Sequence, residues 1–143
     1  GLTFNWGIIM GWTSVTNYIS IEPIILYLSA IFWTLGYDTI YGLQDIRDDE
    51  IIGIKSTSIK FKNKVKFFVG TCYALCVLFV FVLCFVMEID KYLLLLSALF
   101  ILTLIYQVMI FKSGKAETCL AAFKINNLTG FFIFIFIFSF SFL

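Results

Sequence analysis

The stretch Tyr37–Thr57 reads YDTIYGLQDIRDDEIIGIKST, and in it an apolar run gives way to a cluster of carboxylates. If the stretch continues as one helix, Asp38, Asp45 and Asp49 share one face, because they are spaced by seven and four residues. Carboxylates this close repel one another unless a cation compensates them, and oxygen ligands of this kind suit Mg²⁺. The pattern predicts a cation-binding face, with a solvated acidic helix end as the alternative.

The composition of the chain places it in a lipid bilayer. Of its 143 residues, 62% are hydrophobic, 20% aromatic and 13% charged, and the mean hydropathy is +1.03. A soluble domain is roughly 45–50% apolar and carries about twice this share of charge. The formal net charge of +1 shows no excess of either sign, so nucleic acid is not an expected partner. We expect one membrane domain over residues 1–143, in contact with membrane lipid.

Five apolar segments are each long enough, at roughly 20 residues, to cross the hydrocarbon core as a helix. They are approximately 1–21, 23–43, 67–87, 92–111 and 125–143. They contain a single charge, Asp38, near the end of the second segment, and an acid inside a membrane segment suggests function. We therefore expect an all-α, polytopic membrane bundle with about five transmembrane helices.

The cations of the chain are distributed unevenly among the connections between the apolar segments. Nine of the ten Lys and Arg residues lie in the connections 44–66 and 112–124, and the tenth is Lys91. Because Lys and Arg are retained on the cytoplasmic side of a membrane, this split places both connections and the first residue there, and Leu143 outside. The carboxylates are thus expected to open toward the cytoplasm or its equivalent.

Cysteine and histidine usage restricts the chemistry. The four cysteines form no CxxC pair, and three of them lie in one apolar run, so they are predicted to be packing residues. Histidine is absent, which removes the usual imidazole base and the commonest transition-metal ligand. Any metal bound here is expected to have oxygen ligands.

The acidic stretch resembles the second aspartate-rich motif of the UbiA superfamily of intramembrane prenyltransferases, in particular its 4-hydroxybenzoate polyprenyltransferase branch. The pattern that carries the resemblance is YDTxYxxxDxxDDxxxGIKST. A weaker similarity runs through the hydrophobic spans and becomes clearer again at AFKINN, Ala122–Asn127. The similarity corresponds to the C-terminal half of a family member. The matching residues are Tyr37, Asp38, Thr39, Tyr41, Asp45, Asp48, Asp49, Gly53, Ile54, Lys55, Ser56 and Thr57.

The resemblance implies a mechanism. In the family, two aspartate-rich motifs face each other across a cavity and hold Mg²⁺, which binds the diphosphate of a polyprenyl donor. Departure of the diphosphate leaves an allylic cation that attacks the aromatic ring of 4-hydroxybenzoate, a step toward ubiquinone. Transferred to this chain, the similarity makes Asp45 and Asp49 the implied metal ligands and catalytic residues, with Asp48 as a flanking ligand.

Four further residues are candidate substrate contacts. Lys55 and Arg47 are candidate contacts of the diphosphate, and their alternative role is to set the topology as loop cations. Asp38 either lines the cavity or holds Tyr41 by a hydrogen bond, and we favour structural support.

Two other polar stretches have structural interpretations. Asn126 and Asn127 are expected to cap the start of the last span rather than to contact substrate. The basic run KFKNKVK at Lys60–Lys66 is expected to contact lipid headgroups.

The first aspartate motif of the family, of the form NDxxDxxxD, does not occur before Asp38. We therefore expect this chain to be a half that is inactive alone and whose partner is the missing N-terminal half of the enzyme. Two alternatives stay open at this point. One is a fragment of an ion- or proton-coupled transporter, in which the acids mark an ion path, and the other is a degenerate remnant of a split gene. The expected location is a bacterial inner membrane, with the mitochondrial inner membrane as the alternative.

Overall fold

Helices make up almost all of the computed structural model. It describes residues 1–142, and the side chains of all of these except Arg47, 91–93 and 141–142. Within these described residues there is no strand, so the all-α prediction is confirmed. The α-helices are α1 (Leu2–Asn5), α2 (Gly7–Thr16), α3 (Ile21–Tyr41), α4 (Ile46–Ile52), α5 (Thr57–Lys60), α6 (Val65–Val86), α7 (Lys91–Ile110) and α8 (Ala116–Phe138), and two 3₁₀ helices are η1 (Lys62–Lys64) and η2 (Ser139–Phe142).

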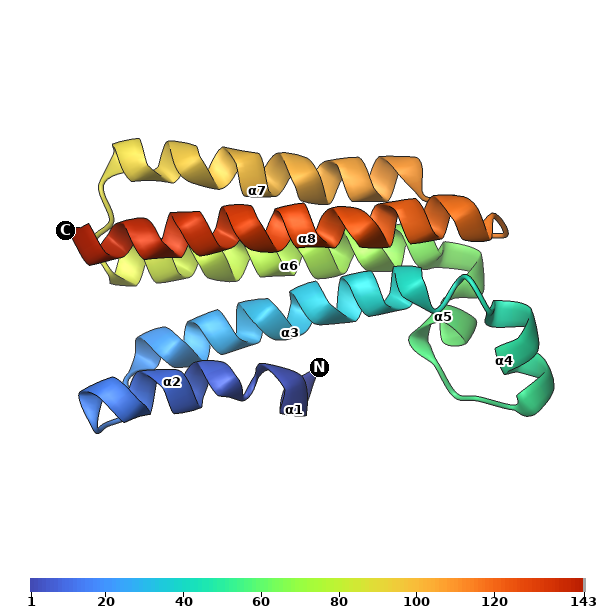
Figure 1. Cartoon of the computed structure of the whole chain (residues 1–143), viewed down its shortest axis with the longest axis horizontal. Coiled ribbons are helices and arrows are strands. Elements are labelled where there is room, and N and C mark those ends of the chain that lie inside the picture. Colours follow the sequence, from blue (N-terminus) through green and yellow to red (C-terminus); the bar gives the residue numbers. More distant parts are fainter. Residues whose placement is uncertain (143) are drawn as a thin grey trace.

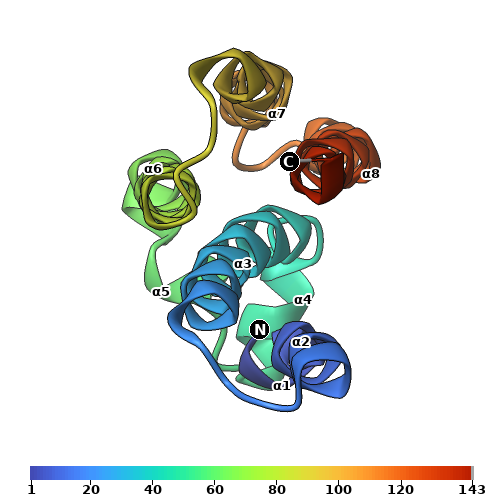
Figure 2. The same cartoon turned by 90° about the vertical axis from the view of Figure 1, so that its left-hand side faces the viewer.

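Four long helices, α3, α6, α7 and α8, run side by side along the molecule (Figure 1). The main packing pairs are α3 with α6 and α7 with α8, and α3 also contacts α8. Figure 2, an end view, shows α7 on one side of the bundle, with α4 and the α1–α2 pair on the far side of α3. Although α6 and α7 follow each other in the chain, they make much less contact than either main pair.

The long helices have the composition of membrane spans. Among the described residues, three helices are long and apolar enough to cross a membrane, namely Ile21–Tyr41, Lys62–Val86 and Ala116–Phe138. The apolar segment Leu94–Ile110 of α7 is shorter. Large apolar side chains such as Phe67 and Phe85 are exposed on these helices, as expected for surfaces that face lipid. The chain is an integral membrane protein.

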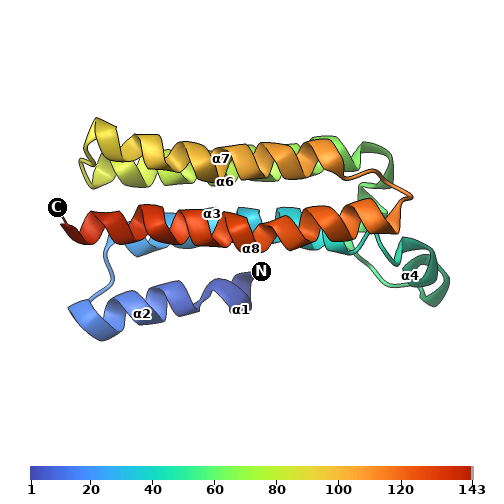
Figure 3. The same ribbon diagram turned by 45° about the horizontal axis from the view of Figure 1, so that its top comes forward.

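The prediction of a single helix over 1–21 is wrong. This segment forms α1 and α2, which are separated at Trp6 and end at Thr16, where Asn17 takes a left-handed conformation with φ of 61°. Hydroxyl groups of the TSVT sequence bond back to carbonyls of their own helix, which weakens helix propagation. The pair lies beside the first half of α3 (Figures 1 and 3), and Gly1 rests near Thr34 rather than at the end of the bundle.

The start of the last span also differs from the expectation. Helix α8 begins at Ala116, about two turns before residue 125, and Glu117 lies in its first turn, where a carboxylate is favoured by the helix dipole. Asn126 and Asn127 therefore lie inside the helix, and the prediction that they cap it is wrong. The helix ends at Phe138, and Leu143, the expected end of the span, lies outside the described residues.

The connections between the helices are divided between the two ends of the bundle in the way that the distribution of cations predicts. The loop region between α3 and α6 and the α7–α8 loop lie at one end, whereas the α2–α3 and α6–α7 loops lie at the other (Figure 1). The structure thus brings the two cation-rich connections to one end. Which compartment they face remains a prediction from the cation split.

Labelling can test this topology. With Lys60→Cys and Lys115→Cys placed one at a time in a variant whose four native cysteines are replaced by Ala, we expect both sites to react from the same side of the membrane. Both lysines are exposed, so a membrane-impermeant maleimide has access to them. Reaction of the two positions from opposite sides would refute the topology.

Buried polar side chains join the long helices. The Tyr73 hydroxyl on α6 donates to Gln107 Oε1 on α7 at 2.6 Å, and Gln107 Nε2 donates to Thr129 Oγ1 on α8 at 2.7 Å. Ser29 Oγ on α3 donates to the carbonyl of Cys76 on α6 at 2.9 Å. Where no water competes, such hydrogen bonds help hold membrane helices together. All four cysteines are free and buried, which confirms their prediction as packing residues.

Candidate functional site

The carboxylate-rich stretch does not continue α3 as one helix, and that prediction is wrong. Helix α3 ends at Tyr41, the chain turns at Gly42, and α4 begins at Ile46 with Asp45 as its N-cap. Gly42 packs directly on Ser58, since a Cβ at this position would lie 2.5 Å from Ser58 Oγ. The close approach redirects the chain after the end of α3.

Three acids gather at the start of α4, Asp45 as its N-cap and Asp48 and Asp49 in its first turn. Asp45 and Asp48 are exposed and Asp49 is half-buried, and the Asp49 amide donates to the Asp45 carbonyl at 2.9 Å. The positive end of a helix favours carboxylates at this position. Asp38 is exposed on the last turn of α3, on a separate helix from the other three acids.

These acids do not by themselves form a metal cage. Across the described residues, no group of three or more His, Cys, Asp or Glu side chains is placed to hold a metal ion. The donor chemistry nevertheless suits Mg²⁺, because Asp45, Asp48 and Asp49 offer carboxylate oxygens on one accessible turn. The arrangement can supply part of a coordination shell, and further ligands would have to come from elsewhere.

Hydroxyl groups of the GIKST segment (residues 53–57) and of the adjacent Ser58 tie the acidic loop to α3. Thr57 Oγ1 and Thr39 Oγ1 share a hydrogen bond of 2.7 Å, and Ser58 Oγ donates to the Thr39 carbonyl at 2.9 Å. Ser56 caps α5 by accepting a hydrogen bond from the Ile59 amide at 3.3 Å. The chain from α4 to α5 is therefore held against the end of α3, and the acids are positioned by it. Gly42 and Ser58 are not among the residues predicted from the sequence, and for Ser58 the run Ser56-Thr57-Ser58, typical of a helix N-terminus, was the available signal.

Substitution of Gly42 should release this loop. We expect Gly42→Ala to push Ser58 away from Thr39, because the added methyl group has no space at 2.5 Å from Ser58 Oγ. Hydrogen exchange of amides in residues 44–60 should accelerate markedly in the variant. In the double variant Gly42→Ala/Ser58→Ala the clash is removed, so exchange should slow relative to the single Gly42→Ala variant. Unchanged exchange in Gly42→Ala would contradict the packing described.

Aromatic side chains form a wall between α3 and α8, at the end of α3 that leads into the acidic loop. Trp33, Tyr37 and Tyr41 recur every four residues along α3. The ring centroids of Tyr37 and Tyr41 lie 6.0 and 4.7 Å, respectively, from the ring centroid of Phe123 on α8. Trp33 Nε1 donates to Asn126 Oδ1 at 2.8 Å, which gives this asparagine an interhelical role that sequence analysis missed. Tyr41 contacts Phe123, and within the described part of the chain no hydrogen bond joins it to Asp38.

The candidate cations lie around the loop. Lys55 is exposed and borders a cavity of ≈ 410 Å³ that Ser56 and Thr57 also line. Lys62 Nζ forms an ion pair with Glu50 Oε1 at 2.7 Å, which ties η1 to α4. The side chain of Arg47, another predicted diphosphate contact, lies outside the described residues.

Comparison with known proteins identifies the family. The model of the UbiA prenyltransferase family matches residues 1–140 of this chain. The chain belongs to the UbiA prenyltransferase family. The resemblance inferred from the acidic motif is thereby confirmed.

Curated relatives of this UbiA-family chain include bacterial and mitochondrial proteins. It is 35% identical over 134 residues to the 4-hydroxybenzoate octaprenyltransferase of Francisella tularensis subsp. novicida, which covers 94% of this chain and 47% of that protein. It is 49% identical over 69 residues to the human mitochondrial 4-hydroxybenzoate polyprenyltransferase, covering 46% of this chain and 18% of that protein. The chain thus spans about half the length of the Francisella relative, and no solved structure matches.

Proposed function

We propose that this chain forms the C-terminal part of an enzyme that transfers a polyprenyl group from polyprenyl diphosphate to the ring of 4-hydroxybenzoate. The observation that carries the proposal is the similarity to the Francisella 4-hydroxybenzoate octaprenyltransferase, which covers 94% of the chain and so includes the acidic turn of α4. The geometry is compatible with this chemistry, because that turn and the aromatic wall lie at the same end of α3.

In the proposed site, Asp45 and Asp49 would hold Mg²⁺, and Asp48 would assist from the same end of α4. When bound, the metal would stabilise the negative charge that develops on the departing diphosphate. The hydrogen bonds of Thr57 and Ser58 with Thr39 hold the acidic loop against α3 and would keep these carboxylates in place. Lys55, and Arg47 beside the acids in sequence, would bind the diphosphate oxygens.

The aromatic wall would act on the prenyl cation rather than on the diphosphate. Ring faces of Tyr37, Tyr41 and Phe123 can stabilise an allylic cation through their quadrupoles. Asp38, exposed next to this wall, would line the cavity. We place the site at the cytoplasmic face of a bacterial inner membrane, with the mitochondrial inner membrane as the alternative.

The test is transfer of a polyprenyl group to radiolabelled 4-hydroxybenzoate in the presence of Mg²⁺. The protein assayed should be a chimaera in which this chain follows the N-terminal half of the Francisella relative, since the chain matches 47% of that protein. Labelled, lipid-soluble product that depends on both polyprenyl diphosphate and Mg²⁺ would support the proposal. A well-folded chimaera that prenylates a different aromatic acceptor, and not 4-hydroxybenzoate, would overturn the substrate assignment.

A further inference from the structure

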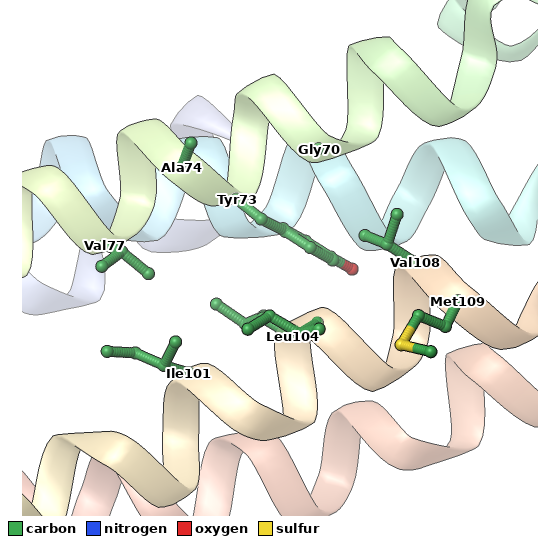
Figure 4. A pocket seen from close by; sticks show the side chains of 9 residues that line it. Gly70, Tyr73, Ala74, Val77, Ile101, Leu104, Val108 and Met109 are labelled. Carbon is green, nitrogen blue, oxygen red and sulfur yellow. The ribbon is translucent and has the colours of Figure 1, made fainter.

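An apolar groove lies between α6 and α7, which separate although they are consecutive in the chain. The groove, which we call the α6–α7 groove, has a volume of ≈ 460 Å³. Gly70, Tyr73 and Ala74 line it from α6, and Leu104, Val108 and Met109 are among the residues that line it from α7 (Figure 4). Ala74 and Met109 are exposed, so the groove opens on the outer surface of the bundle.

The groove is held open by the packing around Tyr73. This side chain reaches from α6 toward α7, and its hydroxyl donates to the buried Gln107, which is bonded in turn to Thr129 on α8. The hydrogen bonds fix the distance between α6 and α7 at this level. Next to Tyr73, Gly70 and Ala74 have too little side chain to fill the space, and a Cβ added to Gly70 would meet no atom within 4 Å. A hydrocarbon chain can therefore enter without rearrangement of the helices.

Cations lie at one end of the α6–α7 groove. Lys66 precedes Gly70 by one helical turn, so it lies on the groove face of α6. Its Nζ is 5.4 Å from the ring centroid of Phe111, which places the ammonium group over the end of α7. Lys112 follows Phe111 directly, and both lysines are exposed. An apolar groove with two cations at its end complements a molecule that has an anionic head and a hydrocarbon tail.

We propose that the α6–α7 groove binds an anionic phospholipid of the surrounding bilayer, with one acyl chain between the helices and its phosphate at Lys66 and Lys112. A single phosphate suits this site better than the diphosphate of a prenyl donor, which needs a metal and carboxylates. The acidic turn of α4 lies on the far side of α3 from α7 (Figure 2). The inference goes beyond the proposed reaction and does not depend on it.

Photolabelling of the purified 143-residue chain tests the proposal. The chain is reconstituted in phosphatidylcholine vesicles that contain a trace of phosphatidylglycerol with a diazirine in its acyl chain, or of phosphatidylcholine with the same diazirine chain. Labelled residues are located by mass spectrometry of peptides. Because each of the two lysines contributes roughly a fivefold preference for anionic lipid, and the two factors multiply, we expect phosphatidylglycerol to label the groove residues about 25-fold more than phosphatidylcholine does.

Two double variants test the headgroup contact and the acyl-chain contact separately. Lys66→Gln/Lys112→Gln should reduce groove labelling by phosphatidylglycerol to the level of phosphatidylcholine. Gly70→Leu/Ala74→Phe fills the groove and should abolish groove labelling by both lipids. Lys124→Gln/Ala121→Phe, at exposed positions of α8 that do not line the groove, is the matched control and should label like the unchanged chain.

Several results would overturn the proposal. Equal labelling of the groove by the two lipids in the unchanged chain would indicate ordinary contact with bulk lipid. A preference for phosphatidylglycerol that survives the lysine substitutions would remove the headgroup assignment. Loss of phosphatidylglycerol labelling on addition of excess geranylgeranyl diphosphate would show that an isoprenoid diphosphate, and not a phospholipid, is the preferred occupant.

Discussion

Asp45→Ala and Asp49→Ala should each lower prenyl transfer by about two to three orders of magnitude when introduced into the chimaera described above. Each substitution removes a carboxylate from the start of α4, and with it part of the proposed Mg²⁺ shell that would stabilise the departing diphosphate. Both positions are at the start of an exposed short helix, so we expect little loss of fold. The measurement is the rate of transfer to radiolabelled 4-hydroxybenzoate as a function of Mg²⁺ concentration.

Two neighbouring acids provide the comparison. Asp48→Ala should have a smaller effect, because its side chain lies to one flank of the face shared by Asp45 and Asp49. Glu50→Ala removes only an exposed ion pair with Lys62 and should leave the rate within about twofold of the unchanged chimaera. Full activity of Asp45→Ala at limiting Mg²⁺ would rule out its assignment as a metal ligand.

The long helices of this protein could be predicted from sequence because lipid imposes strict requirements on them. The predicted segments 23–43 and 67–87 agree with Ile21–Tyr41 and Val65–Val86 to within two residues at each end. A backbone in hydrocarbon must satisfy its own hydrogen bonds, so a long apolar segment has few alternatives to a helix. The segment 1–21 also lacks charged residues but packs as two short helices. Its length and lack of charge do not reveal that hydroxyl groups and a left-handed Asn17 end a helix within it.

The geometry of the candidate site was harder to predict from the sequence than the long helices. The acids themselves were evident, but the turn that separates α3 from α4 depends on contact between Gly42 and Ser58, sixteen residues apart. The hydrogen bond between Trp33 and Asn126 joins residues 93 positions apart, and no local pattern reports such a pair. The local sequence pattern therefore identified the carboxylates of the site, whereas contacts between distant residues determine how these carboxylates are positioned.

The 143-residue chain on its own should show no detectable transfer of a polyprenyl group to 4-hydroxybenzoate. A cluster of two or more Mg²⁺ ions and a diphosphate carries more charge than Asp45 and Asp49 can balance or orient, and the described residues bring no three such ligands together. The NDxxDxxxD string of the family occurs nowhere before Asp38. We therefore propose that a second polypeptide segment, corresponding to the N-terminal half of the relatives, supplies the remaining ligands.

The outer face of α3 supports the same conclusion. Asp38 is exposed on a helix that is apolar enough to span a membrane, and α4 beside it presents Ile51 and Ile52 at 83% and 74% exposure. Contact of Asp38 with lipid would cost up to about 3 kcal/mol, so this face is suited to contact with further protein. We expect co-expression with the N-terminal half of the Francisella relative to restore prenyl transfer, through the same contacts that join the two halves in one chain.

The deciding assay compares three samples at saturating Mg²⁺ with polyprenyl diphosphate and radiolabelled 4-hydroxybenzoate. They are the chain alone, the chain co-expressed with the N-terminal half, and that pair with Asp45→Ala. Product from the pair, its loss in the variant and none from the chain alone is the expected result, because only the pair would surround the diphosphate with carboxylates from both sides. Turnover by the chain alone that disappears with Asp45→Ala would show that the single acidic turn of α4 is sufficient, and the requirement for a second motif would be wrong.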